Sequence, residues 1–239
     1  MKILAFDGTA KVATVAVSED EKILASYSID NGLTQSELLL PMAENMLSSL
    51  GITFDDIDAY ATSVGPGSFT GVRIGVSLVK GLAFGKDKPC VEVSTLEALA
   101  ENLCGLDGMV VPVMDARRAQ VYSATYESTH EGLVKTVEDR AVALSELGEE
   151  LRAVTDKKIY LVGDGYAVAR RALTERGICV EDTPEILINE NAASVARVAY
   201  RKILAGETVT DREIAPLYLR MPQAERERLE RLQNSQSSN

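Results

Sequence analysis

An internal repeat in the order of expected elements most constrains how this chain can fold. Between residues 3 and 84, apolar and β-branched runs predict three strands, a helix, a strand and a second helix, and a short strand at 90–93 and a helix at 94–103 follow. Between residues 109 and 175 the same order of runs returns, and a further helix is expected at 192–204. Because each such unit must bury its own sheet against helices, the repeat predicts two similar α/β lobes rather than one continuous sheet.

The breaks between the expected elements also match across the two halves. Phe6-Asp7 opens into the first hairpin and Met114-Asp115 opens into its counterpart, whereas Gly65-Pro66-Gly67 and Gly163-Asp164-Gly165 each separate a strand from a helix. Tandem β-β-β-α-β-α lobes are the plan of the duplicated actin-like fold, also called the ASKHA or ribonuclease-H-like fold. We therefore expect an α/β protein with this duplicated fold.

Length and composition set the expected boundaries and the compartment. The 239 residues suffice for lobes at 1–104 and 105–222, and the polar composition of 223–239 predicts a charged extension with a disordered tail. No apolar run approaches the roughly 18–20 residues that cross a membrane, and the N-terminus lacks the pattern of a signal peptide. We expect a cytoplasmic protein that does not bind membranes.

Charge and histidine content exclude several kinds of site. The net charge of −11 argues against tight binding of RNA by this chain alone, because phosphate-binding proteins usually carry a basic face. The only histidine, His130, lies in a polar stretch that is typical of a hairpin turn. A single histidine cannot build an HExxH or paired-histidine metal site, and three dispersed cysteines without a CxxC pair do not indicate zinc. We expect no metal site and no catalytic residue.

The two expected hairpin turns are the candidate nucleotide site. In actin-like proteins the phosphates of ATP lie against these turns, so Asp7, Gly8, Thr9 and Asp115 are candidate ligands of ATP or ADP with magnesium. The alternative is that both aspartates only cap tight turns. The second turn lacks glycine, although a phosphate needs close approach of the backbone. A nucleotide is therefore a candidate cofactor and not an obligatory one.

Two helices, expected at 35–50 and 69–84, have unusually wide apolar surfaces. Apolar side chains span about 180° of the first helix, although burial against one sheet needs only about 100°. On the second, the polar residues Arg73, Ser77 and Lys80 form a narrow strip. We infer that each helix buries one side against a partner protein; the alternative is that the two helices cover each other. The candidate contact residues are Leu38, Leu39, Met42, Met46, Gly71, Val72, Gly75, Val76 and Val79.

Three motifs carry a resemblance to a known family. The stretch 63–75, with sequence SVGPGSFTGVRIG, resembles the bacterial TsaB (YeaZ) family, and so do VMDARRAQVY at 113–122 and PLYLR at 216–220. The resemblance covers about residues 1–225. It implies the duplicated actin-like fold and a role in forming threonylcarbamoyladenosine on tRNA.

The resemblance also implies partners. TsaB proteins pair through the two N-lobe helices with TsaD, the catalytic subunit, are joined by the ATPase TsaE, and form homodimers when alone. The tRNA would be reached only through the complex. Whether ATP or ADP with magnesium sits at the complex interface stays open. Whether Arg117 and Arg118 contact tRNA or a partner stays open.

One position departs from the family pattern. Gln35 stands where TsaB relatives commonly have histidine, and TsaD carries its metal-binding histidine pair on this helix. The departure agrees with a catalytically silent subunit. The rival interpretations are an actin-fold nucleotide-binding kinase or ATPase, and an inactive glycoprotease-like homologue.

Overall fold

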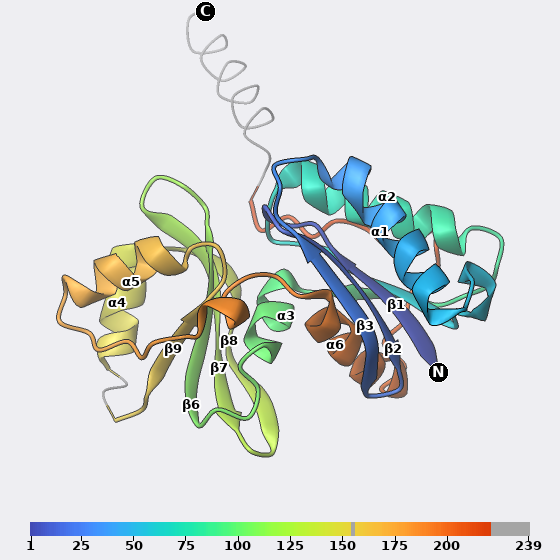
Figure 1. Cartoon of the computed structure of the whole chain (residues 1–239). Helices are drawn as coiled ribbons and strands as arrows, with labels where there is room; N and C mark the ends of the chain where they lie inside the picture. Colours follow the sequence, from blue (N-terminus) through green and yellow to red (C-terminus); the bar gives the residue numbers. More distant parts are fainter. Residues whose placement is uncertain (154–155, 221–239) are drawn as a thin grey trace, which may run out of the picture.

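The computed structural model of this chain describes residues 1–153 and 156–220. These residues form two α/β lobes side by side, with two helices between the sheets (Figure 1). The expected extension and tail at 223–239 lie outside the described residues.

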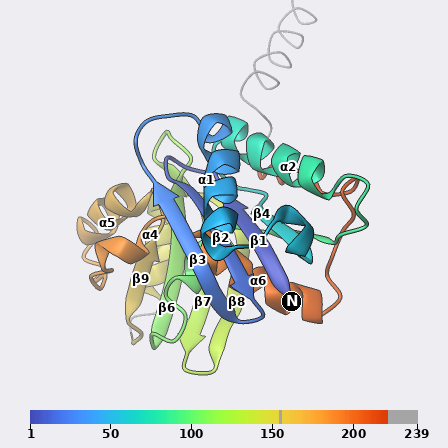
Figure 2. The ribbon, with the colours of Figure 1, turned by 45° about the vertical axis from the view of Figure 1, so that its right-hand side comes forward.

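The first lobe is built on a five-stranded sheet in the order β3-β2-β1-β4-β5. The first three strands are antiparallel neighbours, and β4 and β5 continue the sheet in parallel with β1. Helices α1 and α2 cover one face of this sheet (Figure 2). The bounds are β1 Lys2–Asp7, β2 Ala13–Glu19, β3 Lys22–Ile29, α1 Gln35–Leu50, η1 Phe54–Asp56, β4 Ala59–Ser63, α2 Phe69–Ala83 and β5 Cys90–Val93.

The second lobe repeats this plan with a four-stranded sheet in the order β8-β7-β6-β9. Its first three strands are again antiparallel and β9 again runs parallel to β6, while a single parallel bridge from Tyr160 to Glu181 extends the sheet beyond β9. The repeat confirms the duplicated actin-like fold. The bounds are β6 Gly108–Asp115, β7 Gln120–Thr129, β8 Gly132–Ala143, α4 Leu144–Arg152, β9 Ile159–Val162, α5 Tyr166–Thr174 and η2 Glu185–Leu187.

Two further helices, α3 (Thr95–Glu101) and α6 (Ala192–Leu204), join the lobes. The small side chains of α6 pack on the first sheet against Ala5, Ala61 and Val93, whereas Leu96 and Leu99 of α3 belong to the core of the second lobe. Each helix therefore covers the sheet of the other half of the chain.

This exchange corrects the expected boundary at residue 104. The α6 helix comes from the second half of the sequence yet forms part of the first lobe, and Ile214 also lies in the first-lobe core. The buried carboxylate of Glu101 on α3 ties the two helices together through ion pairs with Arg197 and Arg201 of α6, 3.2 and 2.6 Å long. The sequence periodicity predicted the helices but not which sheet each one covers.

The residues expected to contact a partner through α1 and α2 lie in the core of their own lobe. All of them are buried by the rest of the chain, and Met46 has no exposed surface. The prediction that an uncovered apolar face of these residues meets a partner is therefore wrong. The helices cover the sheet and each other, which was the alternative. The residues concerned are Leu38, Leu39, Met42, Met46, Gly71, Val72, Gly75, Val76 and Val79.

Two of the glycines of α2, Gly71 and Gly75, allow close packing inside the lobe. A Cβ atom on Gly71 would lie 2.0 Å from the carbonyl oxygen of Gly8, and one on Gly75 would lie 2.7 Å from Oγ1 of Thr62. Both distances are too short for a side chain, so α2 can lie this close to the first hairpin and to β4 only with glycine at these positions.

Local signals set the limits of α1. The backbone N–H of Thr34 donates to the Glu37 carboxylate at 2.9 Å, which satisfies a group at the start of the helix. Gly51 ends the helix with a left-handed φ of 67°. Among the described residues, no helix is long and apolar enough to cross a membrane.

Candidate functional site: the cleft between the lobes

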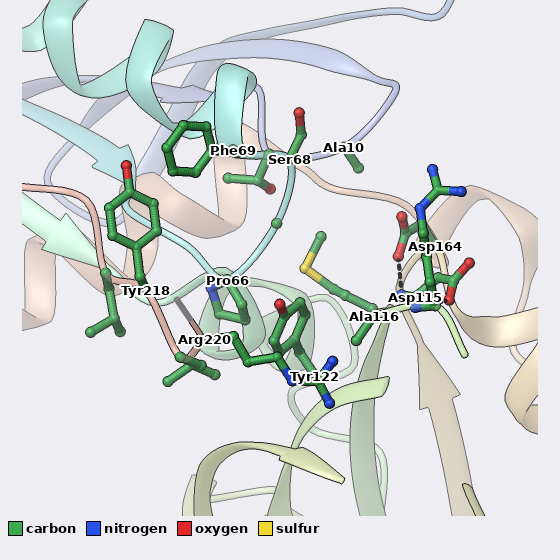
Figure 3. Close-up of a pocket in the computed structure, with 16 residues that line it drawn as sticks. Ala10, Pro66, Ser68, Phe69, Asp115, Ala116, Tyr122, Asp164, Tyr218 and Arg220 are labelled. Carbon is green, nitrogen blue, oxygen red and sulfur yellow. Dashed lines mark hydrogen bonds between the residues drawn. The ribbon is translucent and has the colours of Figure 1, made fainter. Parts of the chain in front are cut away.

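A cleft of about 400 Å³ lies between the two lobes. Five chain segments meet there: the β1–β2 turn, the loop from β4 into α2, the β6–β7 turn, the β9–α5 loop at Asp164, and residues 217–220, which we call the C-terminal strap. Figure 3 shows Ser68, Phe69 and Ala10 on one side and Ala116 and Tyr122 on the other. The lining is thus shared by both lobes.

Of the four candidate nucleotide ligands, Thr9 and Asp115 line the cleft, whereas Asp7 and Gly8 do not. The Asp7 carboxylate is 1% exposed at the end of β1. Its Oδ1 accepts from the backbone N–H and the hydroxyl of Thr9 at 2.8 and 2.7 Å, and its Oδ2 accepts from the Ser63 hydroxyl at 2.5 Å. Asp7 therefore braces the turn from inside, as the capping alternative predicted.

The first turn is held tightly by its own chain. Gly8 is buried beneath α2, and the backbone N–H of Ser68 donates to the carbonyl of Thr9 at 2.6 Å. On the other side, Nε2 of Gln35 donates to the carbonyl of Ala10 at 2.9 Å. Gln35 therefore positions this turn.

Asp164 lies next to Asp115 in the structure. The sequence indicated only that Gly163-Asp164-Gly165 separates a strand from a helix. The backbone N–H of Asp115 donates to Oδ1 of Asp164 at 3.0 Å, and Oδ1 of Asp115 accepts from the backbone N–H of Arg117 at 2.7 Å. Burial, together with the charge of Asp115, raises the pKa of Asp164. The turn that follows is strained, because Arg117, Arg118 and Ala119 have φ angles of 61°, 56° and 56°.

Glu190, just before α6, is a buried acid that the sequence did not single out. It is 4% exposed, and neither carboxylate oxygen has a hydrogen-bond partner among the described residues. Burial raises its pKa well above the usual value, and the charge of Asp7 raises it further. Burial also raises the pKa of Asp7, but three donors offset that effect. We assign the proton to Glu190 and the negative charge to Asp7.

Aromatic and arginine side chains at the strap were also missed. The Tyr218 ring stacks on Phe69 with centroids 5.1 Å apart, and the Arg73 guanidinium lies 3.7 Å from the centroid of Phe69. Two residues further along the strap, Arg220 lies over the Tyr122 ring and donates to Gln120. The strap is thus attached to both lobes. The sequence marked the segments that hold these residues only as family motifs, and the proximity of residues about 100 or more positions apart is what shows that they form a cluster.

The side chains present do not fit the expected magnesium–nucleotide site. Both oxygens of Asp7 accept internal hydrogen bonds, and Asp7 is outside the cleft. Within 1–153 and 156–220, no three His, Cys, Asp or Glu side chains are grouped to hold a metal ion. Asp115 and Asp164 remain as the acids that line the cleft.

Known proteins resemble this chain in both sequence and fold. The chain is 32% identical over 222 residues to the tRNA threonylcarbamoyladenosine biosynthesis protein TsaB of Escherichia coli K12, covering 92% of this chain and 95% of that protein. The chain belongs to the TsaB family. The TsaB protein of Bacillus subtilis 168 is also 32% identical, over 73% of this chain and 76% of its own length.

Two other comparisons agree with the TsaB family. The solved structure of YeaZ from Pseudomonas aeruginosa superposes with a TM-score of 0.73 at 25% identity, covering 91% of this chain and 99% of that one. The family model for TsaD, tRNA N6-adenosine threonylcarbamoyltransferase, matches residues 34–228. The TsaB family and the TsaD family are therefore related across most of this chain.

Proposed function

We propose that this chain is a non-catalytic subunit of the bacterial complex that forms threonylcarbamoyladenosine on tRNA. In this proposal it pairs with a TsaD-like catalytic subunit, works with a TsaE-like ATPase, and forms a homodimer when alone. The observation that carries the proposal is the 32% identity to E. coli TsaB over 92% of the chain, because an alignment of that extent includes both lobes.

The chemistry of the described side chains supports a non-catalytic role. The only histidine, His130, is exposed between β7 and β8, where its Nε2 lies 3.4 Å from an Asp107 carboxylate oxygen. Asp7, which could have held magnesium, is used to brace a turn. The side chains of this subunit would therefore shape the complex, and the partner would supply the reacting groups.

The outer side of the α1–α2 layer remains the best candidate for the partner surface, with different residues from those expected. Leu40 on α1 is 37% exposed. Ile74, Leu78 and Leu82 are four residues apart along α2 and are only partly buried. A partner helix could cover these side chains without disturbing the core beneath them.

Size-exclusion chromatography of this chain with the TsaD-like chain of its own cell tests the pairing. Wild type should elute as a complex, and Leu40→Glu should weaken the complex while keeping its own thermal unfolding transition. Val168→Glu is the matched control, because Val168 is an exposed apolar residue on α5 in the other lobe. Failure of wild type to form a complex would contradict the proposed pairing, and equal binding by Leu40→Glu would contradict the proposed surface.

A further inference from the structure

The loop between β3 and α1 contains the only Asn-Gly pair of the sequence, Asn31-Gly32. Both residues are exposed, and so are Leu33 and Thr34 after them. Gly32 has a left-handed φ of 78°, and a Cβ atom there would have no atom within 4 Å. Glycine has no side chain to shield its amide nitrogen, so this nitrogen can approach the side-chain carbonyl of the asparagine before it. The loop therefore exposes a pair that can react with itself.

The backbone amide of Gly32 is free to act as the nucleophile. Its N–H has no hydrogen-bond partner among the residues that the structure describes. In the Asp164-Gly165 pair, by contrast, the N–H of Gly165 donates to the carbonyl of Val113 at 3.0 Å. An amide that is already hydrogen-bonded must break that bond before its nitrogen can lose a proton and attack. Of these two pairs, only Asn31-Gly32 has its nucleophile available.

The side-chain amide of Asn31 is held as the electrophile. The backbone N–H of Leu33 donates to Oδ1 of Asn31 at 3.1 Å, which draws electron density away from the Cγ carbon. In the described part of the chain, Nδ2 of Asn31 has no partner that would keep it from leaving. Asn45 differs, because it lies inside α1 and its Nδ2 donates to the carbonyl of Pro41 at 2.9 Å. The fold thus leaves Asn31 reactive and restrains Asn45.

We propose that Asn31 is a site of spontaneous deamidation in the folded protein. The nitrogen of Gly32 forms a bond to Cγ of Asn31, the Cγ–Nδ2 bond breaks, and the proton of the Gly32 amide leaves with Nδ2 as ammonia. Water then opens the resulting succinimide ring at either carbonyl. The products are an aspartate or an isoaspartate at position 31, and the reaction uses no oxidant, cofactor or enzyme.

Either product changes the connection that leads into α1. Isoaspartate carries the chain through its side chain and so adds one backbone atom between Ile29, the last residue of β3, and Gln35, the first residue of α1. Both products add one negative charge to a chain that already carries −11. Since Gln35 holds the β1–β2 turn through the carbonyl of Ala10, the modified connection is the one that places a residue of the cleft wall's support.

Peptide mapping by mass spectrometry tests the site on the full chain, kept folded at mildly alkaline pH. Cleavage at glutamate places Asn31 and Asn45 on different peptides. The peptide with Asn31 should gain the mass of an amide-to-acid conversion and separate into aspartate and isoaspartate forms, whereas the peptide with Asn45 should stay unmodified. Gly32→Ala should slow the reaction roughly tenfold, because a Cβ hinders the nitrogen and disfavours the left-handed backbone.

Gly206→Ala is the matched control, because Gly206 is also exposed, has a φ of 77°, and leaves a Cβ with no atom within 4 Å. It should leave the rate at Asn31 unchanged. The same chain unfolded in urea gives the rate without the fold. An Asn31 that stays intact in the folded chain, whether or not the unfolded chain converts, would overturn the proposal. Conversion of Asn45 at the rate of Asn31, equal slowing by both substitutions, or no slowing by Gly32→Ala would also overturn it.

Discussion

Nε of Arg73 on α2 donates a hydrogen bond of 2.8 Å to the hydroxyl of Tyr218, which joins the C-terminal strap to the first lobe. Beside this contact, the backbone N–H of Leu217 donates to the carbonyl of Val64 at 2.7 Å. The strap therefore forms one wall of the cleft through contacts between residues that are 145 positions apart.

Tyr218→Phe should loosen the strap without unfolding the protein. The substitution removes the acceptor for Arg73 but keeps the ring on Phe69, so we expect a cost of about 0.5–1 kcal/mol. Tyr218→Ala should cost about 0.5–1.5 kcal/mol more, because the stack is also lost. Hydrogen exchange at the Leu217 amide measures both effects, and unchanged exchange in Tyr218→Ala would contradict this role.

The glycines of α2 give a prediction with an internal control. Gly71→Ala should lower the free energy of unfolding by about 2–3 kcal/mol, because the new Cβ would meet the carbonyl of Gly8 at 2.0 Å. In Gly81→Ala, on the same helix, the new Cβ has no atom within 4 Å, so this substitution should raise the free energy of unfolding by about 0.5–1 kcal/mol. Urea denaturation measures both, and equal effects of the two variants would show that close packing does not explain Gly71.

Met46→Glu should prevent folding rather than only dissociate a complex. Met46 has no exposed surface, so an unpaired carboxylate there should cost at least about 3 kcal/mol. Leu40→Glu, six residues earlier on the exposed side of α1, should keep the wild-type circular dichroism spectrum and melting transition. If the Met46→Glu protein folds and only fails to bind its partner, the result would contradict this account and support the sequence-based prediction that Met46 contacts the partner.

Glu190 makes stability depend on pH. Its pKa in the folded protein is raised well above the ordinary value of 4.5, so the folded state binds its proton more tightly than the unfolded state does. The contribution of Glu190 to the free energy of unfolding is therefore fully present below pH 4.5 and is lost as the pH rises through its folded-state pKa. Glu190→Gln keeps the shape without the charge and should raise the melting temperature at pH values above the folded-state pKa, with little difference near pH 4. A lower melting temperature at high pH would contradict the unpaired acid.

Local structure was readable from the sequence where a single residue sets it. Thr34 and Gly51 mark the two ends of α1, and the helix expected at 35–50 agrees with the observed Gln35–Leu50. The matching breaks at Asp7 and Asp115 predicted both hairpins, because a repeated strand order leaves few other topologies.

Long-range placement was not readable. An apolar arc on a helix indicates that its side chains will be buried, but not whether the residues that cover them belong to the same chain. Met42 and Val76 were therefore assigned to a partner, although their own lobe covers them. The unpaired acid Glu190 was missed for the same reason, since its burial arises from the meeting of distant segments.

The level of threonylcarbamoyladenosine in tRNA tests the account most directly. Mass spectrometry of tRNA nucleosides should show that this modification falls when the chain is depleted from its own cell. Expression of the wild-type chain from a plasmid should restore it, because a required subunit limits the whole complex. An unchanged level of threonylcarbamoyladenosine after complete depletion would contradict the proposed role in tRNA modification.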